Sequence, residues 1–481
     1  MLPEIVVERE VGDTLNLKPY YSPYLSLSSL PLTFGFTYGS YSDLSGISIK
    51  GGSPRGNAVY LNGILINQPQ SSYADLTDIS PFLFGKLQVI DGGFSPYSFY
   101  GNLNFKPSKD RATYGFANSF LGFSAGLRDS FGGFDFGNLI GEKDTLTFFE
   151  GSIFTRSFWN LRFSRKRTSG MEGFPQSSGI QTDLRVLGSF GNFELLVLGR
   201  EWKDKLVESY HTNFRFGRKF ELWKFRFLGY LEGVKSSNIG SKIRPIVFLS
   251  EELSIFNGFF SWNVWMDKSR LGYGSHFNLP IKFFILSASI SNRIPSFDEL
   301  YWKGAQAEGN PKLKNEKSLT FTSELRYGDF YFSWFFRRIW DIIEWRNFGG
   351  IWRPENFSSG NIWGLSFGLM KKGIRFKYDR LYAYYDWGKR MIYRPRNSYN
   401  LNLSSKHLDV SMIYLDPRFS NQANTRFVDY VFKLDLYAKM QIFGFQLVFG
   451  AENITNRKNY FVEGYPSRGR TLVFSVFYKQ L

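Results

Sequence analysis

From about residue 111 to the C-terminus, apolar and polar residues alternate with a period of two. The alternation is clear at 319–327, 374–378 and 432–440, where Phe, Leu, Ile and Tyr occupy most alternate positions and charged or hydroxyl side chains stand between them. Successive side chains of a β-strand point to opposite faces, so the pattern predicts strands with one apolar face. Many of these strands look about ten to fifteen residues long, whereas soluble strands usually have about five or six. This region is therefore predicted to be nearly all β.

The aromatic content suggests what covers the apolar faces. The chain has 52 Phe, 28 Tyr and 12 Trp, together 19% of its residues. A soluble protein that exposed so many rings would tend to aggregate, whereas a membrane barrel has an apolar outer wall and aromatic girdles at its rims. The sequence has no run of 18 or more apolar residues, so no transmembrane helix is expected. We predict a membrane β-barrel, with a large soluble β-sandwich or propeller as the alternative.

The connections between strands have two lengths. Short turns such as 190–192 and 327–329 alternate with longer segments such as 168–179, 305–317 and 348–360. Short turns on one side and long loops on the other are typical of transmembrane barrels, and our count of about 21 strand candidates is close to the even number that such barrels require.

Residues 1–108 differ from this pattern. Gly, Ser and Pro are frequent, the strand candidates are short, and the continuous apolar stretch at 58–66 indicates burial on both faces. We predict a small mixed domain that is enclosed by the rest of the protein.

Composition also restricts the chemistry. The net charge is +17, but Lys and Arg are spread along the chain, which favours lipid head groups or an anionic ligand over nucleic acid. The absence of Cys excludes disulfides and thiolate metal sites. The three histidines are scattered and no Gly-x-Ser-x-Gly motif occurs, which argues against an outer-membrane hydrolase, the enzyme alternative. We predict no catalytic residue and no cofactor. We also predict no metal site, because no ligand spacing supports calcium at Asp298 and Glu299.

Five segments carry further information. In the N-terminal region they are 47–51 (Ile-Ser-Ile-Lys-Gly), 58–64 (Ala-Val-Tyr-Leu-Asn-Gly-Ile) and 87–101, which contains Leu-Gln-Val-Ile-Asp-Gly and Tyr-Ser-Phe-Tyr-Gly. In the C-terminal region they are 292–318, which contains Asn-Arg-Ile-Pro-Ser-Phe-Asp-Glu-Leu-Tyr and Gly-Asn-Pro-Lys-Leu-Lys-Asn-Glu-Lys-Ser, and 452–470, which contains Glu-Asn-Ile-Thr-Asn and Gly-Tyr-Pro-Ser-Arg-Gly-Arg. In this order the segments resemble the motifs of TonB-dependent outer-membrane receptors, most closely those of the vitamin B12 type.

The resemblance implies an all-β membrane protein with three parts. These are an N-terminal TonB-box-like segment at 1–10, a small α+β plug at 11–108 and a 22-stranded antiparallel transmembrane barrel at 109–481. It also implies a monomer in the outer membrane, in contact with lipid and lipopolysaccharide, that imports a large polar ligand such as a cobalamin-like corrinoid or a siderophore-type metal chelate. An exported protein needs a signal peptide, and the residues after Met1 do not form one, so we expect that it has been removed.

The segment at 4–8 occupies the position of the family's TonB box. It consists of Glu4, Ile5, Val6, Val7 and Glu8. An extended segment of this kind can add a strand to the sheet of a periplasmic TonB-type partner. Tension on the segment would then remodel the plug and open a path. The alternative is that these residues are the first strand of the plug.

Two turns of the plug are candidates for ligand contact. If plug strands alternate in direction, the turn at Ser53–Arg55 faces the periplasm and the turns at 36–41 and 68–73 are apical. Amide, hydroxyl and ring groups in the apical turns suit a large polar ligand. The candidate residues are Thr37, Tyr38, Ser40, Tyr41, Gln68, Gln70, Ser71, Ser72 and Tyr73.

The chain departs from the family where the plug is thought to be locked to the barrel. The family has two plug arginines that pair with barrel glutamates, here Glu299 and Glu316. This chain has Lys50 and Asp91 at the arginine positions, and Asp91 reverses the charge. Either barrel Lys and Arg side chains rebuild the lock or the plug is held in another way. This departure and a shortened plug favour the alternative function, a passive pore or adhesin without energy coupling.

Overall fold

The computed structural model describes residues 13–17, 28–38, 44–93, 95, 97–108, 110–155, 157–168, 170–172, 178–205, 207–268 and 270–479. Residues 4–8, Ser40 and Tyr41 lie outside this part of the chain. Among the described residues, no helix is long and apolar enough to cross a membrane.

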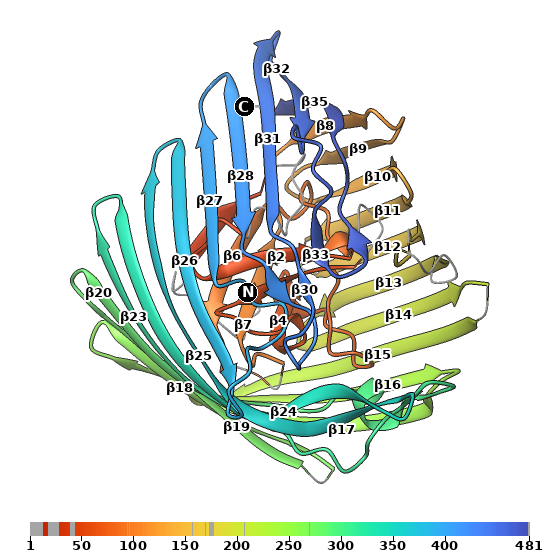
Figure 1. Cartoon of the computed structure of the whole chain (residues 1–481), viewed down its shortest axis with the longest axis vertical. Helices are drawn as coiled ribbons and strands as arrows, with labels where there is room; N and C mark the ends of the chain where they lie inside the picture. The colour runs from red at the N-terminus through yellow and green to blue at the C-terminus, as the bar shows by residue number, and fades with distance from the viewer. Residues whose placement is uncertain are drawn as a thin grey trace.

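The C-terminal region forms a closed antiparallel barrel of 22 strands (Figure 1). The first half of the wall consists of β8 (Ala112–Asn118), β9 (Phe123–Arg128), β10 (Gly132–Ile140), β11 (Thr145–Phe154), β12 (Phe158–Arg167), β13 (Ile180–Phe190), β14 (Phe193–Lys203), β15 (Glu208–Leu222), β16 (Phe225–Ser236), β17 (Gly240–Ile255) and β18 (Gly258–Asp267). The second half consists of β19 (Arg270–Ile281), β20 (Phe284–Arg293), β23 (Glu316–Tyr327), β24 (Phe330–Phe348), β25 (Ile351–Lys371), β26 (Ile374–Tyr385), β27 (Asn397–Ser404), β28 (Leu408–Leu415), β31 (Val431–Ile442), β32 (Phe445–Glu452) and β35 (Thr471–Lys479). The barrel closes where β35 pairs antiparallel with β8.

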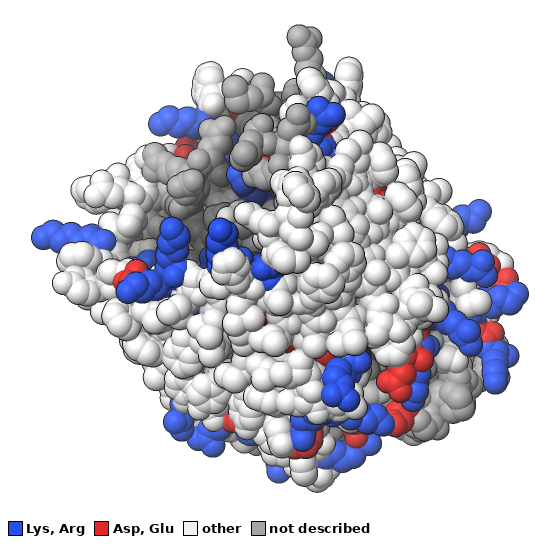
Figure 2. Space-filling model, turned by 90° about the horizontal axis from the view of Figure 1, so that it is seen from above, with Lys and Arg blue, Asp and Glu red and all other residues white. Residues whose placement is uncertain are grey.

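The alternation predicted from the sequence distributes side chains between the two sides of the wall. In β12, Arg162, Ser164 and Lys166 are buried on the inner side, whereas Leu161 and Phe163 are exposed on the outer side. Seen from one side, the wall is a broad surface without charged groups, and Lys, Arg, Asp and Glu gather at its margins (Figure 2). The polar face is therefore the buried one, as expected for a barrel in lipid.

The connections confirm that the two rims differ. Strands meet at one rim in tight turns such as Phe443–Gly444, where both residues have positive φ (49° and 83°), as the type I′ turns that suit twisted hairpins require. Longer loops leave the other rim, which we call the long-loop rim. They contain α2 (Phe297–Tyr301) and the short pairs β21 (Lys303–Gly304)–β22 (Ala307–Glu308), β29 (Arg418–Phe419)–β30 (Phe427–Val428) and β33 (Tyr460–Val462)–β34 (Tyr465–Pro466).

One predicted loop is wrong. The segment 348–360 was expected to be a loop, but β24 and β25 continue through it and meet at Gly349–Gly350. Both glycines have positive φ (62° and 97°), so they make the tight turn that the long hairpin needs. Polar and glycine-rich composition suggested a loop because the hairpin extends beyond the apolar wall.

The N-terminal region lies inside the barrel (Figure 1). Its main sheet has the order β1-β6-β7-β4-β5. These strands are β1 (Asp13–Asn16), β4 (Asn57–Leu61), β5 (Ile64–Leu65), β6 (Lys86–Asp91) and β7 (Gly101–Lys106), with the short turns η1 (Pro54–Gly56) and η2 (Leu76–Asp78). A separate sheet pairs β2 (Thr33–Thr37) with β3 (Ser45–Ile49). Leu83, Leu103 and Phe105 of this plug are fully buried in a cluster that includes Leu187 of the barrel, so plug and barrel share a core.

Candidate functional site

The plug surface that faces the long-loop rim borders two cavities, one of about 1080 Å³ and one of about 340 Å³. Both are lined by Phe36, Tyr38 and the turn Ser53–Arg55. Arg55, whose side chain is 46% exposed, is the charged plug residue that borders both. The turn at 53–55 thus forms the ridge between the two cavities.

This position corrects the prediction that Ser53–Arg55 lies at a periplasmic turn. The prediction assumed that β3 and β4 alternate in direction within one sheet. Instead β3 pairs with β2, whereas β4 pairs with β5 and β7 in the other sheet. The turn between β3 and β4 therefore connects two sheets, and it lies on the same side as the turn at 68–73.

The larger cavity has walls from the plug, the barrel and the loops. Five of the residues that were predicted to contact a ligand line this cavity, namely Tyr38, Gln68, Gln70, Ser71 and Tyr73. Thr37 and Ser72 are almost fully buried and do not line the cavity. The remaining walls supply indole, amide and charged groups from Gln181, Arg200, Trp202, Asp204, His211, Asn238, Asp298, Trp302, Gln306 and Trp352.

The turn at 68–73 is held rigidly. Ser72 has a φ of 57°, and its N–H donates to the carbonyl of Gln68 at 2.8 Å. The Tyr73 hydroxyl donates to the carbonyl of Ser45 at 2.5 Å, which ties the turn to the start of β3. Burial raises the pKa of Tyr73 well above its usual value, so this hydroxyl stays a hydrogen-bond donor. A rigid turn offers a ligand a preformed surface.

Gln70 joins the plug to the barrel and to α2. Its N–H donates to Oδ1 of Asn213 at 2.9 Å, and its side-chain nitrogen lies 3.2 Å from Nδ1 of His211. Its carbonyl accepts a hydrogen bond from the N–H of Asp298 at 2.8 Å. A ligand that displaced this turn would therefore also disturb α2, and a ligand that displaced α2 would disturb the turn.

Asp298 places a carboxyl group in the wall of the larger cavity. It lies in the first turn of α2, whose start is fixed by a capping box between Ser296 and Glu299. Its Oδ1 is buried without a hydrogen-bond partner among the described residues. Burial raises the pKa of Asp298 to about 7, although Gln70 and Arg55 oppose this shift. The group can therefore accept a hydrogen bond from a ligand, or donate one when protonated.

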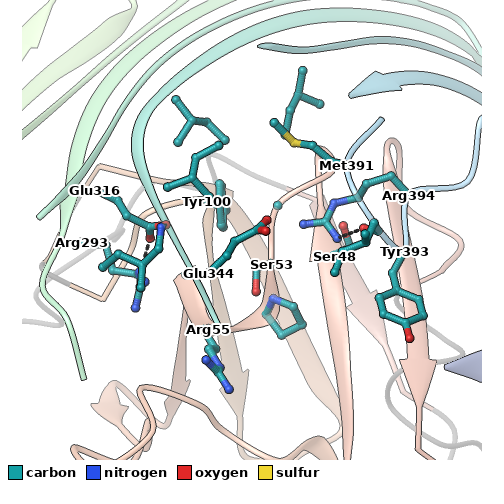
Figure 3. Close-up of a pocket in the computed structure, with 18 of the residues that line it drawn as sticks. Ser48, Ser53, Arg55, Tyr100, Arg293, Glu316, Glu344, Met391, Tyr393 and Arg394 are labelled. Carbon is teal, nitrogen blue, oxygen red and sulfur yellow. Dashed lines mark hydrogen bonds and ion pairs between the residues drawn. The ribbon is translucent and has the colours of Figure 1, made fainter. Parts of the chain in front are cut away.

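The smaller cavity is lined by two of the four proposed lock residues, Glu299 and Glu316, and Glu316 is labelled in Figure 3. Glu299 and Glu316 both bind Arg293 of the barrel, and Nη1 of Arg293 lies 3.0 Å from Oε2 of Glu299. Arg55 of the plug approaches Oε1 of Glu299 to 3.7 Å. Lys50 instead donates to Oγ1 of Thr322 at 2.7 Å. Asp91 ends β6 opposite Gly101, and its side chain is outside the described part of the structure.

Barrel cations hold the plug mainly through its backbone, a feature that the sequence analysis did not locate. Arg337 donates to the carbonyls of Ile49, Lys50 and Tyr100 at 3.3, 3.0 and 3.3 Å. Lys377 donates to the carbonyls of Leu30 and Thr33 at 3.0 and 2.6 Å. Contacts of the same kind run from Arg162 to Thr77, from Arg185 to Asp78 and from Arg215 to Leu65. The signal in the sequence was Lys and Arg at inward positions of the alternating strands.

One attachment is a buried ion cluster. Lys166 lies 2.9 Å from Oδ2 of Asp75 and 2.8 Å from Oδ1 of Asp78. Although burial opposes ionisation, Lys166 and Arg162 hold the pKa of Asp78 well below its usual range. Asp75 also accepts the N–H of Ser45 at 3.0 Å, so the cluster connects β12 to β3. Removing one partner of such a cluster would leave a buried charge uncompensated.

Comparison with known proteins places this architecture. No family model matches the chain. A vitamin B12 transporter of Photobacterium profundum is 28% identical over 174 residues, which cover 32% of this chain and 27% of that protein. The chain thus matches only about a quarter of that relative's length.

Solved structures resemble the whole fold. The siderophore receptor PirA of Acinetobacter baumannii has a TM-score of 0.67 and 12% identity, covering 97% of this chain and 98% of its own. The FrpB iron transporter of Neisseria meningitidis has a TM-score of 0.68 and 11% identity, with 98% and 100% covered. The copper transporter OprC has a TM-score of 0.67 and 13% identity, with 98% and 100% covered. The plugged 22-stranded barrel and the match to a vitamin B12 transporter both support the resemblance to TonB-dependent outer-membrane receptors that the sequence motifs indicated.

Proposed function

We propose that the protein is a TonB-dependent importer that binds a large polar ligand in the cavities above its plug and admits it by energy-coupled plug movement. The observation that carries this proposal is the cavity of about 1080 Å³ on the long-loop side of a lumen filled by the plug. Its volume reaches the upper end of the usual range for small-molecule sites, about 300–1,000 Å³. Amides of Gln68 and Gln181 and the indoles of Trp302 and Trp352 provide hydrogen bonds and stacking surfaces.

Two ligand classes fit these walls, a cobalamin-like corrinoid and a siderophore-type metal chelate. Arg55 offers an exposed cation, and Oδ1 of Asp298 offers an acceptor without a hydrogen-bond partner among the described residues. A chelate with peripheral carboxylates or phenolates can bind Arg55, whereas a corrinoid with amide arms can bind Asp298 and the glutamines. The relatives named above are a vitamin B12 transporter, a siderophore receptor, a copper transporter and an iron transporter, so both ligand classes are candidates for this chain.

The energy would enter through residues 4–8. The structure describes the chain from Asp13, where β1 begins. Within the described part of the chain, this strand pairs only with β6, at the edge of the main sheet, through four residues. A pull on the preceding segment therefore acts first on a short edge strand, which is held by few hydrogen bonds. A TonB-type periplasmic protein that pairs with the segment Ile5–Val7 would supply this pull.

The experiment measures binding and uptake separately. Cells that produce the full chain, or the chain without residues 1–10, are given labelled cyanocobalamin or a labelled ferric siderophore. We expect the deletion to leave binding unchanged and to abolish uptake of the ligand that binds. Val6→Pro should act like the deletion because proline removes a donor needed for strand pairing, whereas Val6→Thr should import normally.

The cavity itself has a matched control. Trp302→Ala combined with Trp352→Ala should weaken binding by about tenfold, because each loss of a stacked ring costs about 0.5–1.5 kcal/mol. Trp223→Ala should not, because Trp223 is 91% exposed in a turn at the opposite rim. Uptake that does not depend on residues 1–10 would instead indicate a passive pore, and binding of cells without uptake of any ligand would indicate an adhesin or static receptor.

A further inference from the structure

Two arginines meet on the outer wall of the barrel, far from the cavities just described. Arg380 lies in β26, and its Nε donates to the hydroxyl of Tyr382 at 2.6 Å. The guanidinium carbon of Arg380 lies 5.4 Å from the centre of the Tyr382 ring, and that of Arg396, just before β27, lies 5.1 Å from it. Two positive charges are thus held beside one aromatic ring.

These side chains face away from the plug. In β26, Leu381, Ala383 and Tyr385 are buried toward the lumen, so Arg380 and Tyr382, which alternate with them, point outward. Tyr382 stacks on the outward Trp363 of the neighbouring strand, with ring centres 3.9 Å apart and planes 12° apart. Tyr and Trp gather at the level of lipid head groups in membrane proteins. The pair of arginines therefore lies in the aromatic girdle near the long-loop rim.

The charge of the pair is not neutralised within the protein. Among the described residues, no carboxylate lies within 4.0 Å of a guanidinium nitrogen of Arg380 or Arg396. Asp416 contacts Asn397, the residue that follows Arg396, but its Oδ2 accepts the N–H and the side-chain amide of Asn397 at 3.0 and 2.6 Å. Arg338, on the same face, shows the contrasting arrangement: its two terminal nitrogens bind Asp386 at 2.5 and 2.7 Å.

We propose that Arg380, Arg396 and Tyr382 bind the phosphate head group of an outer-leaflet glycolipid of the lipid A type. Two like charges in an interface of low dielectric repel strongly, and an anion placed between them removes that repulsion. Guanidinium groups bind phosphate oxygens through paired hydrogen bonds, which a zwitterionic head group with its own cation satisfies less well. Acyl chains of the same lipid would lie on the apolar wall below, next to Trp363 and the neighbouring outward side chains. The site is independent of the imported ligand and of energy coupling.

The test counts bound lipid on the purified full chain in a neutral maltoside detergent. The probes are lipid A, phosphatidylcholine and inorganic phosphate, and bound molecules are counted by native mass spectrometry across a titration. We expect lipid A to bind the native protein, with affinity falling about fivefold in Arg380→Gln or Arg396→Gln and about 30-fold in the double variant. Arg338→Gln is the matched control and should bind lipid A as the native protein does.

Each other outcome overturns the proposal. Equal affinity of the double variant and the native protein would show that lipid A binds elsewhere, and an equal loss in Arg338→Gln would show only a general effect of charge. Inorganic phosphate that displaces lipid A at millimolar concentration would assign the site to a free anion. Folding of each barrel is checked by its heat-dependent migration in gels. If the glutamine variants fail to fold, Arg380→Lys with Arg396→Lys keeps both charges but loses the paired hydrogen bonds, so its affinity for lipid A must fall below that of the native protein, and an unchanged affinity would overturn the proposal.

Discussion

Replacing Lys377 by Met should loosen one part of the plug without opening the barrel. The Lys377 ammonium, 2% exposed, is held by Asp379 at 2.8 Å and donates to the plug carbonyls of Leu30 and Thr33. Asp379 in turn accepts the N–H of Leu32 at 3.0 Å. The segment from Leu30 to Thr33 is thereby anchored to β26 from both sides. Methionine keeps the length of the side chain but removes both donations.

The expected magnitude follows from these contacts. A hydrogen bond from a charged donor contributes about 1.5–3 kcal/mol, so two such bonds give an upper value of about 6 kcal/mol. A cavity of about 420 Å³, lined by Ser29 and the turn at 370–375, lies next to the start of this segment, so water can enter and replace part of the loss once the segment loosens. We therefore expect about 3 kcal/mol, which corresponds to about a 150-fold rise in the opening equilibrium of the segment.

Hydrogen exchange of backbone amides measures this opening directly. Amides of β2 and β3 should exchange about 150-fold faster in Lys377→Met, while those of β12 and β13 in the barrel should not change. Lys439→Met is the control. Lys439 also binds a buried aspartate, Asp409, at 2.7 Å, but this ion pair joins two barrel strands and does not involve the plug. Each variant leaves a buried aspartate, Asp379 or Asp409, without its lysine but with hydroxyl donors. The cost of that unpaired carboxylate is common to both variants and cancels when they are compared.

Two results would refute this reasoning. Faster exchange of β2 and β3 in Lys439→Met as well would show that loss of any lumen cation loosens the plug. Unchanged exchange of β2 and β3 in a folded Lys377→Met protein would show that the backbone contacts of Lys377 contribute little. In that case the plug would depend on other attachments, such as those of Arg337 to Ile49 and Tyr100.

Three further predictions follow from single side chains. Burial raises the pKa of Asp298 from 3.8 to about 7; because this folded-state pKa lies above the unfolded one, its stabilisation of the folded form is complete below about pH 4 and is lost as pH rises through 7. The protection factors of α2 amides, which correct for the base-catalysed rise of intrinsic exchange, should therefore be lower at pH 8 than at pH 5, and Asp298→Asn should remove this difference in protection. Leu103→Ala, at a fully buried plug position, should destabilise the plug sheet by about 2–5 kcal/mol in urea unfolding followed by exchange, whereas a smaller effect would mean that the plug repacks. Tyr97→Phe removes the hydroxyl that lies 2.5 Å from both oxygens of Glu232, and it should cost about 1–3 kcal/mol, with no change if Arg215 and Arg244 alone satisfy that carboxylate.

The barrel was predictable because its signal is local and repeated. The alternating segments at 319–327 and 432–440 lie in β23 and β31, and the short turns at 190–192 and 327–329 are turns between strands. Each strand carries its own evidence of which face meets lipid, so errors in one do not affect the others. The error at 348–360 arose where a hairpin leaves the membrane and the apolar constraint on its composition ends.

The site was predictable only in part, because its walls come from distant parts of the chain. The turn at 68–73 could be placed from its position after an apolar strand. Arg55 was assigned to the wrong side, because the pairing of β4 with β7 joins residues more than forty positions apart and no local pattern encodes it. Trp302 reaches the cavity from the loop after α2 and Trp352 reaches it from β25, which depends on the order of strands around the closed barrel.

The way in which the plug is attached bears on the reversed charge at Asp91. In an attachment between side chains, withdrawal of the plug leaves a buried charge on each side. Here Arg337 and Lys377 donate to plug carbonyls, so a plug segment that moves away carries no unpaired charge with it. Lys377 keeps Asp379 as its partner in the wall after the segment has left. Such contacts can break and reform one at a time as the backbone slides, because every residue presents a similar carbonyl. The replacement of the two lock arginines by Lys50 and Asp91 is therefore compatible with a plug that moves. An importer and a static barrel differ in one respect: only in an importer does tension on the N-terminal residues displace the segment from Leu30 to Thr33.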